Sequence, residues 1–308
     1  MIRKGENFPL WGQKLPTHSF FEGIELLYFT DTSFGNFLLH DHNDLEIILI
    51  LDGNVEMLIE DVRYSVPQGS LITIPIHQTH HTIIPPQTKR YERIVLHIFP
   101  EYLEVLAEQF FLDRHRFDFC HEVHILEYTP DSLWTFRTMF ERAFHAQSQN
   151  SEYQRIVIPC LMIELFMELE LRIKNQASPS LPITNNLVSA VVDYIDEHFS
   201  EAKLSMEQIC SSVYVSQGYL SRVFKSYTGT SVYSYLLYKR LIYAKHLLAN
   251  GSNVLDACMS CGFSDYTCFL KAFKRAYRQT PSAFCRQHHK DNFNRSSQSA
   301  PRLTGGLL

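Results

Sequence analysis

The sequence predicts an α+β protein with two domains, the first mainly β and the second entirely helical. Up to about residue 110, short apolar runs alternate with turn residues, as in an all-β sandwich or barrel. The last third instead has helical apolar spacing, and its charge is opposite in sign to that of the rest. A chain of 308 residues has room for about two domains of the usual ~100–200 residues.

The composition indicates a globular chain, with 45% hydrophobic and 20% charged residues. No apolar run approaches the ~18–20 residues of a membrane helix. The first residues have a basic start but lack the apolar centre of a secretory signal. The seven cysteines form no disulfide framework, so we expect free thiols and a cytoplasmic protein.

The β part is predicted from the runs GIELLYF, GNFLLH, LEIILIL, VEMLIE, SLITIPI and RIVLHIF, which turn residues such as Asp52-Gly53-Asn54 separate. The apolar spacing then becomes helical. One helix is expected to bury Leu133, Phe136, Met139, Phe140 and Phe144. A second helix is expected to carry an apolar stripe that packs in the core or at a helix–helix interface. This stripe comprises Ile156, Cys160, Ile163, Phe166, Met167 and Leu171.

The domain boundaries follow from a stretch with two prolines and no charge, NQASPSLPITNN, which is typical of a linker. The polar, Ser-rich end of the chain is expected to be disordered. We therefore predict a first domain at 1–174 (barrel about 20–110, helices about 131–174), a linker at 175–186, a second domain at 187–288 and a tail at 289–308.

Charge is divided unevenly along the chain. From Ile183 onward there are 14 Lys and Arg against 8 Asp and Glu, a net charge of +6, whereas the preceding residues carry −11. A basic end on an acidic body indicates a polyanionic partner at that end only.

A helix-turn-helix is predicted at the start of this basic region. Ser205 and Gln208 have the spacing of a capping box, so a helix begins there and ends near Val213. Ser216 is expected to cap the next helix, which would read DNA. Its inward residues are predicted to be Tyr219, Leu220, Val223 and Phe224, which leaves Gln217, Ser221, Arg222 and Lys225 for solvent or DNA.

The same pattern then occurs a second time. A long helix from Ser231 to Ala249 leads to a short helix at 253–261, a turn, and a helix capped by Asp265. At an offset of 49 residues, the alignment pairs Leu220 with Phe269, Arg222 with Lys271, Phe224 with Phe273 and Lys225 with Lys274. The alternative is a plain bundle whose charged faces are solvated, but the repeat and the charge division favour two DNA-reading helices.

These segments resemble the DNA-binding domain of the AraC/XylS family of transcription regulators. The resemblance covers about 100 residues, including LSMEQICSSVYVSQGYLSRVFKSYTGTS, YLLYKRLIYAKHLL and ACMSCGFSDYTCFLKAFKRAYRQTPSAF. It implies that both reader helices enter successive major-groove segments of double-stranded DNA. It also implies a homodimer, a small-molecule effector such as a sugar, and RNA polymerase as a further partner. The base contacts that it implies come from Gly218, Ser221 and Arg222, and from Tyr266, Thr267 and Lys271.

Three positions depart from common family usage. Gly218 has no side chain where many members carry a large one. Lys271 stands where Arg is usual, and Lys cannot make the bidentate fork to guanine as well as Arg does. Cys285 follows Phe284 near the end of the domain, where the family typically has a tyrosine followed by an arginine. In this chain Arg286 comes one place later.

In the β part, His40-x-His42-x3-Glu46-x6-Gly53 resembles the first motif of cupin barrels. Pro75-x4-His80 resembles the second, with His77 in place of a glycine. His40 and His42 share a strand face because side chains alternate with period two. Three imidazoles and a carboxylate suit Fe, Mn, Zn or Ni. Three roles are open for His40, His42, Glu46 and His80, namely contact with a polar effector, metal binding, and a structural role.

The main prediction is a ligand-responsive transcription regulator with a cupin-like barrel and no enzymatic activity. The alternative is a cupin-type metal-dependent enzyme with an accessory helical domain. A third hypothesis is a thiol sensor that uses Cys258, Cys261 or Cys268. His81 and His97 add imidazoles near the motifs, but either can lie on the outer face of the barrel.

Overall fold

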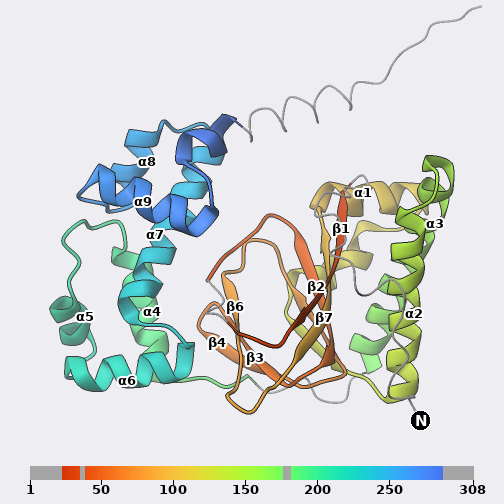
Figure 1. Ribbon diagram of the computed structural model, residues 1–308, viewed down its shortest axis with the longest axis horizontal. Helices are drawn as coiled ribbons and strands as arrows, with labels where there is room; N and C mark the ends of the chain where they lie inside the picture. The colour runs from red at the N-terminus through yellow and green to blue at the C-terminus, as the bar shows by residue number, and fades with distance from the viewer. Residues whose placement is uncertain (1–22, 35–38, 176–181, 287–308) are drawn as a thin grey trace, which may run out of the picture. The chain divides into compact units, whose positions relative to one another are not determined.

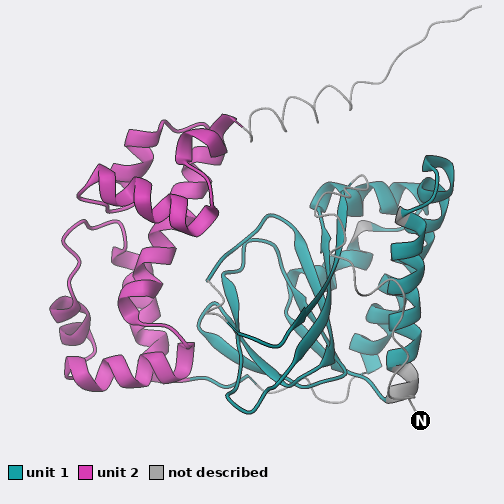
Figure 2. Ribbon diagram, in the orientation of Figure 1, with its two compact units in different colours: residues 1–184 teal, residues 185–308 magenta. Residues whose placement is uncertain are grey.

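The computed structural model describes residues 23–34, 39–175 and 182–286. They belong to two compact units, residues 1–184 and 185–308 (Figures 1 and 2). Residues 176–181 of the predicted linker and the whole predicted tail lie outside the described part of the chain.

Two antiparallel sheets form the β part of unit 1. The larger sheet has the order β1 (Ile24–Asp31), β7 (Tyr91–Ile98), β2 (Leu45–Asp52), β5 (Ser70–Ile74) and β8 (His124–Glu127). The smaller has the order β4 (Val62–Val66), β3 (Val55–Ile59) and β6 (His80–Ile83). The predicted β-barrel is therefore confirmed, but it extends past residue 110, because the four-residue β8 pairs with β5 at the edge.

The sequence of β2, LEIILILD, shows why this strand is central. Its side chains alternate between two apolar layers, so the run is apolar throughout rather than at every second residue. Ile48 and Ile50 pack inside the barrel, with Met57 and Val95. The outward set of β2, comprising Leu45, Ile47 and Leu49, packs in the same core as the helices.

The outer face of the larger sheet is covered by helices (Figure 1), which are α1 (Pro100–Gln109), the 3₁₀ helix η1 (Arg114–His121), α2 (Pro130–Gln147) and α3 (Ser151–Asn175). In α2 the predicted Phe136, Met139 and Phe140 are buried. The stripe predicted for α3 is only partly a core face, because Phe166 is buried but Ile156, Cys160 and Leu171 are exposed. The buried residues of α3 are Ile158, Pro159, Leu161, Met162, Leu165, Phe166 and Leu169.

Unit 2 is helical, with α4 (Asn186–His198), α5 (Met206–Ser212), α6 (Gln217–Thr228), α7 (Val232–Ala249), α8 (Val254–Ser260), α9 (Tyr266–Tyr277) and a helical segment at 281–286. α7 connects the two helix-turn-helix units. From α7, Arg240 donates 2.7 Å hydrogen bonds to the carbonyl oxygens of Phe199 and Glu201, just after α4. Across the described residues, we find no helix that combines the length and the apolar character needed to cross a bilayer.

Candidate functional site

The start of the first helix-turn-helix unit agrees with the prediction. The Ser205 hydroxyl accepts a hydrogen bond from the Gln208 N–H, and the Gln208 side chain accepts one from the Ser205 N–H. This reciprocal capping box begins α5. Ser216 occupies the N-cap position of α6, but its side chain makes no capping hydrogen bond, contrary to the prediction.

The reader helix α6 has one buried face and one polar exposed face. Leu220 and Phe224 are fully buried. Tyr219 was expected to face inward, but 48% of it is exposed, because each residue turns by about 100° from the one before. The exposed residues include all of the predicted DNA-facing ones, Gln217, Gly218, Ser221, Arg222 and Lys225.

The second reader, α9, has the same arrangement. Phe269 and Phe273 are buried at the positions equivalent to Leu220 and Phe224. The Asp265 carboxylate accepts the Cys268 N–H, so Asp265 is the predicted N-cap. The predicted DNA-facing residues Tyr266, Thr267, Lys271 and Lys274 are all exposed.

The repeat is not uniform over the whole unit. The N-caps Ser205 and Asn253 are 48 residues apart rather than 49. Tyr214 and Gly262, also 48 apart, take the same place in their turns, with φ of 56° and 79°. The second unit therefore has one more residue between the turn and the reader helix, which an alignment of the readers alone does not reveal.

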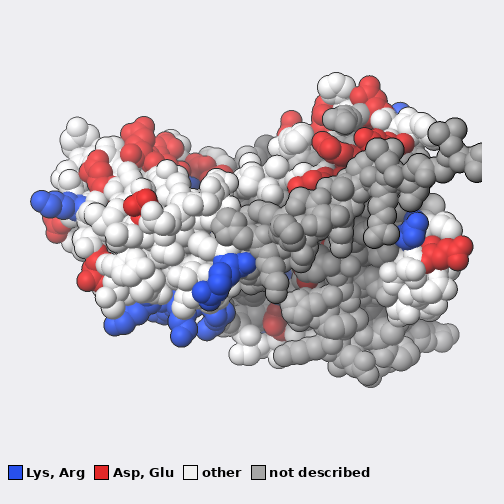
Figure 3. Space-filling view, turned by 90° about the horizontal axis from the view of Figure 1, so that it is seen from above, with Lys and Arg blue, Asp and Glu red and all other residues white. Residues whose placement is uncertain are grey.

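Charge is also polarised on unit 2. In Figure 3, Lys and Arg side chains gather along one edge of this unit, and Asp and Glu along the opposite edge. The outward Arg222 and Lys225 of α6 are matched by Lys271, Lys274 and Arg275 on α9. Exposed cations on both reader helices are suited to contacts with phosphates and base edges.

In unit 1 the structure brings the two cupin-like motifs together. His40 and His80 form an antiparallel bridge through both backbone N–H groups, at 3.1 and 2.8 Å, and their ring centroids are 4.3 Å apart. The His42 ring lies 4.9 Å from that of His80. Glu46, on β2, places Oε2 3.3 Å from His42 Nε2 and 3.0 Å from His80 Nε2.

Two further residues join this group. His97 on β7 is the register partner of Glu46 on β2, so both side chains point into the barrel, and His97 Nε2 lies 3.8 Å from Glu46 Oε1. Asp44 Oδ1 lies 2.8 Å from His42 Nδ1 and 2.9 Å from His97 Nδ1. We call these six residues, His40, His42, Asp44, Glu46, His80 and His97, the histidine cluster. The sequence motifs did not include Asp44 or decide the side on which His97 lies.

The cluster strongly perturbs its own ionisation. Burial lowers the pKa of His42, but the hydrogen bonds and charges of Asp44 and Glu46 outweigh burial and raise that pKa to about 10. Burial raises the pKa of Asp44, but His42 and His97 together lower it to about 2. Glu46 is likewise held well below its ordinary pKa by His42 and His80, against the effect of burial. Perturbed groups that converge in this way are typical of functional sites.

The second motif has a backbone feature that explains its usual glycine. His77 has a φ of 60°, a left-handed conformation that glycine adopts without strain. The His77 N–H donates to the His42 carbonyl at 2.9 Å, which ties the two motifs together. His81 follows His80 in β6, so by alternation it points to the other face of the sheet.

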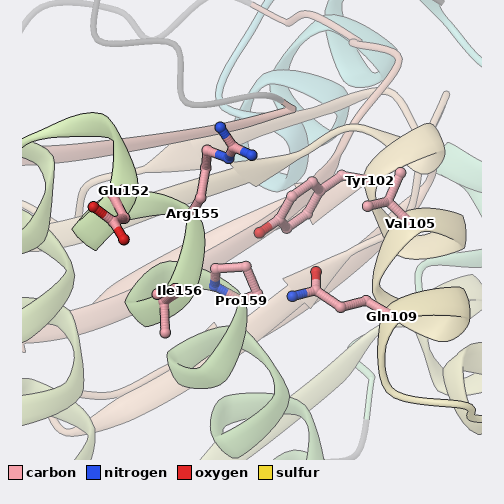
Figure 4. A pocket seen from close by; sticks show the side chains of 7 residues that line it. All are labelled: Tyr102, Val105, Gln109, Glu152, Arg155, Ile156 and Pro159. Atoms are coloured by element: carbon pink, nitrogen blue, oxygen red, sulfur yellow. The ribbon is translucent and has the colours of Figure 1, made fainter. Parts of the chain in front are cut away.

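A separate pocket lies between α1 and the start of α3, with a volume of about 660 Å³ (Figure 4). The hydroxyl of Tyr102 and the amide of Gln109 point toward the space beside Pro159. No sequence pattern marked this pocket. It is lined by Tyr102, Val105, Gln109, Glu152, Arg155, Ile156 and Pro159, and so includes none of the predicted ligand residues.

The cysteines do not support thiol chemistry. All seven are free. Burial raises the pKa of Cys258 and raises that of Cys261 to about 12, the opposite of what a reactive thiolate requires. The Cys261 Sγ donates to the Ala257 carbonyl within α8, as a packed helical residue does. A hydrogen bond with Asp265 raises the pKa of the exposed Cys268.

Comparison with known proteins identifies both units. Residues 25–166 match the family model of the AraC-like ligand binding domain, and residues 209–287 match that of a helix-turn-helix domain. Among solved structures, ToxT from Vibrio cholerae is 13% identical over 86% of this chain and 98% of its own, with a TM-score of 0.39.

Named relatives include an uncharacterized HTH-type transcriptional regulator, YijO, from Escherichia coli (strain K12), 35% identical over 33% of this chain and 36% of its own. The regulatory protein PocR from Salmonella typhimurium is 32% identical over 32% of this chain and 33% of its own. The matched segment thus spans about a third of these two relatives. The probable transcriptional regulator LumQ from Photobacterium leiognathi is 26% identical over 80% of this chain and 90% of its own. With a ligand-binding unit and a helix-turn-helix unit both matched, this chain belongs to the AraC/XylS family.

Proposed function

We propose that this chain binds double-stranded DNA through α6 and α9 and regulates transcription in response to a small molecule held in unit 1. The observation that carries the proposal is the repeated exposed polar face. Each reader helix buries two apolar residues at equivalent positions, Leu220 and Phe224 on α6 and Phe269 and Phe273 on α9, and leaves its polar residues open to solvent. A bundle of solvated helices has no need to repeat such a face.

The two readers differ in what they can recognise. Arg222 can form a bidentate contact with a guanine, whereas Lys271 supplies a single charge without a fork. Gly218 adds no side chain, and a Cβ built there meets nothing within 4 Å, so the helix can approach a DNA backbone closely at this point. Lys225 and Lys274 serve phosphates, so binding should weaken steeply with salt.

In unit 1 we assign the effector to the end of the barrel that carries the histidine cluster. His40 is exposed there, while His80 and Glu46 are buried, so the polar groups extend from the surface inward. A small polar molecule such as a sugar can exchange hydrogen bonds with imidazole and carboxylate groups. Differential binding of the effector to two conformations would then bias the DNA-binding state.

The outward residues of α3 support a homodimer. Ile156 and Leu171 are more than half exposed, and Trp134 on α2 is 56% exposed. α3 is thus apolar on faces other than the one that it buries against the barrel. Exposed apolar surface on neighbouring helices is typical of a subunit interface. RNA polymerase is the further partner that we assign to a regulator of this kind.

Selection of genomic DNA fragments by the full-length protein tests the proposal directly. We expect a limited set of fragments that share a sequence, with a yield that changes when candidate sugars are added. Enrichment of no sequence over the input library would overturn the regulator assignment. The alternative of a metal-dependent enzyme has no support among the named relatives, which are regulators.

A further inference from the structure

The geometry points to a binding site for one divalent first-row transition-metal ion in the histidine cluster, with His40, His42, His80 and Glu46 as ligands. This inference deepens the proposed function, because it concerns the end of the barrel assigned to the effector. It depends only on the side chains of unit 1 and not on DNA binding.

The donor atoms are close enough for one ion. One ring nitrogen from each of His40, His42 and His80 lies within 4.8 Å of the other two. Two donors on a shared ion, each at ~2.1 Å, lie at most about 4.2 Å apart, so small side-chain shifts complete the site. Glu46 Oε2 is already 3.0 and 3.3 Å from the His80 and His42 Nε2 atoms.

The remaining ring nitrogens are already engaged, which orients the donors. His80 Nδ1 lies 2.8 Å from the Gln78 carbonyl oxygen. His42 Nδ1 lies 2.9 Å from the Asp44 carbonyl oxygen and 2.8 Å from Oδ1 of the same residue. With a proton retained on each Nδ1 for these oxygens, an ion would displace any proton on Nε2 and use the Nε2 lone pair on the side of Glu46. Oxygen acceptors behind ligating histidines are the usual outer support of protein metal sites.

One buried nitrogen of the cluster has no hydrogen-bond partner when no cation is bound. His80 is 1% exposed, and its Nε2 makes no hydrogen bond although Glu46 Oε2 lies 3.0 Å away. A buried polar atom without a hydrogen bond is costly and calls for an explanation. An ion between Nε2 and Oε2 would bind both atoms and remove the mismatch.

The donor set narrows the chemical class of the ion. Three imidazoles and one carboxylate suit Zn²⁺, Fe²⁺, Ni²⁺ or Mn²⁺ rather than Ca²⁺ or Mg²⁺, which prefer oxygen ligands. Asp44 contacts the rings of both His42 and His97 and touches none of the proposed donor nitrogens. We therefore assign Asp44 as a positioning residue for the rings of His42 and His97, and His40, His42, Glu46 and His80 as the ligands.

Metal binding should be measured on the untagged full-length protein after treatment with a chelator, with Zn²⁺ and Co²⁺ as probes. We expect one ion per chain by elemental analysis, and a visible Co²⁺ absorption band that Zn²⁺ abolishes. Glu46→Gln and His42→Asn should each weaken Co²⁺ binding at least tenfold, with circular dichroism verifying that they fold. The matched control is His115→Ala, which removes an exposed histidine that lies 3.1 Å from Asp118.

Several results would overturn the inference. They are the absence of stoichiometric metal, equal loss in His115→Ala, and unchanged Co²⁺ binding in folded Glu46→Gln. Asp44→Asn should weaken Co²⁺ binding about 10–100-fold and shift the Co²⁺ band, whereas a purely structural residue would change only the thermal stability. DNA binding, measured separately with and without chelator, reports on the proposed function independently.

Discussion

Gly262, in the turn of the second helix-turn-helix unit, lies directly against the carbonyl of Phe199 at the end of α4. A Cβ built on Gly262 would be 2.5 Å from that oxygen, and the Gly262 backbone has a φ of 79°. The same carbonyl accepts the Arg240 Nε hydrogen bond from α7. The Phe199 carbonyl thus connects the second turn to both α4 and α7.

Replacement of Gly262 by alanine should therefore destabilise unit 2 by about 2–4 kcal/mol, as the sum of left-handed strain and overpacking. Hydrogen exchange at the amides of α8 and α9 should measure the loss. Gly251→Ala is the matched control, because Gly251 has a φ of 90° but nothing within 4 Å of its Cβ position. It should cost only the strain, about 1–2 kcal/mol. Equal effects of the two variants would show that the contact with Phe199 is unimportant.

Tyr214 occupies the equivalent place in the first turn, and its substitution should have the opposite sign. This residue has a φ of 56° and is 95% exposed, so its ring buries little surface. Tyr214→Gly should stabilise the first unit by about 0.5–1 kcal/mol, since relief of strain exceeds the added entropy of glycine. Exchange rates at the amides of α5 and α6 should fall. A rise in those rates would mean that the tyrosine ring contributes contacts that the exposure does not reveal.

The sequence predicted these two turns unequally, and the reason is physical. Gly262 signals a turn in the sequence, because glycine adopts a left-handed backbone without strain. Tyr214 gives no such signal, because a tyrosine takes this conformation only where the rest of the fold compensates for the strain. The capping residues Ser205 and Asp265 were predicted correctly, since a cap depends on neighbours within three residues.

The barrel end was harder to predict, because it is assembled from separate strands. The motif spacing identified His40, His42, Glu46 and His80, but the place of His97 depends on the register of β7 against β2. That register is set by packing on both faces of the sheet, which local patterns do not encode. The stripe assigned to α3 was only partly correct as a core face for a related reason, because a helix that is apolar on several faces has no unique buried side.

Asp265 should make the N-terminus of α9 sensitive to acid. A hydrogen bond from the Cys268 backbone N–H lowers the pKa of this carboxyl below its ordinary value of 3.8. The stabilising contribution is thus present above the unfolded pKa and is lost as the pH falls through the lower, folded value. Asp265→Asn keeps a capping oxygen but cannot titrate. The difference in α9 stability between wild type and this variant should be constant well above pH 3.8, the ordinary pKa, and should change as the pH falls below it. A difference that is constant with pH would contradict the cap assignment.

Gly218 separates a folding requirement from a DNA-binding one. It lies within the first turn of α6, has no positive φ and leaves open space at its Cβ position. Gly218→Ala should stabilise α6 by about 0.5–1 kcal/mol, because alanine has the higher helix propensity. Thermal unfolding measures the first effect and DNA affinity the second. A stabilised variant with weaker DNA binding would indicate that the DNA backbone approaches this position. Unchanged affinity would remove Gly218 from the DNA interface.

The reader assignment itself is tested by Arg222→Ala and Lys271→Ala. Each should weaken binding to a selected DNA site by about 1–3 kcal/mol, and Arg222→Ala should also relax the preference at the base that it contacts. Both side chains are exposed, and Arg222 donates a 3.3 Å hydrogen bond to the Gly218 carbonyl within its own helix, so neither change should unfold unit 2. Lys89→Ala removes an exposed charge from unit 1 and controls for the change in net charge.

Fluorescence anisotropy at several salt concentrations separates phosphate contacts from base contacts. Loss of a phosphate contact lowers the salt dependence of the affinity by about one ion, whereas loss of a base contact leaves it nearly constant. If both variants bind the selected site as tightly as the Lys89 control does, α6 and α9 are not the readers.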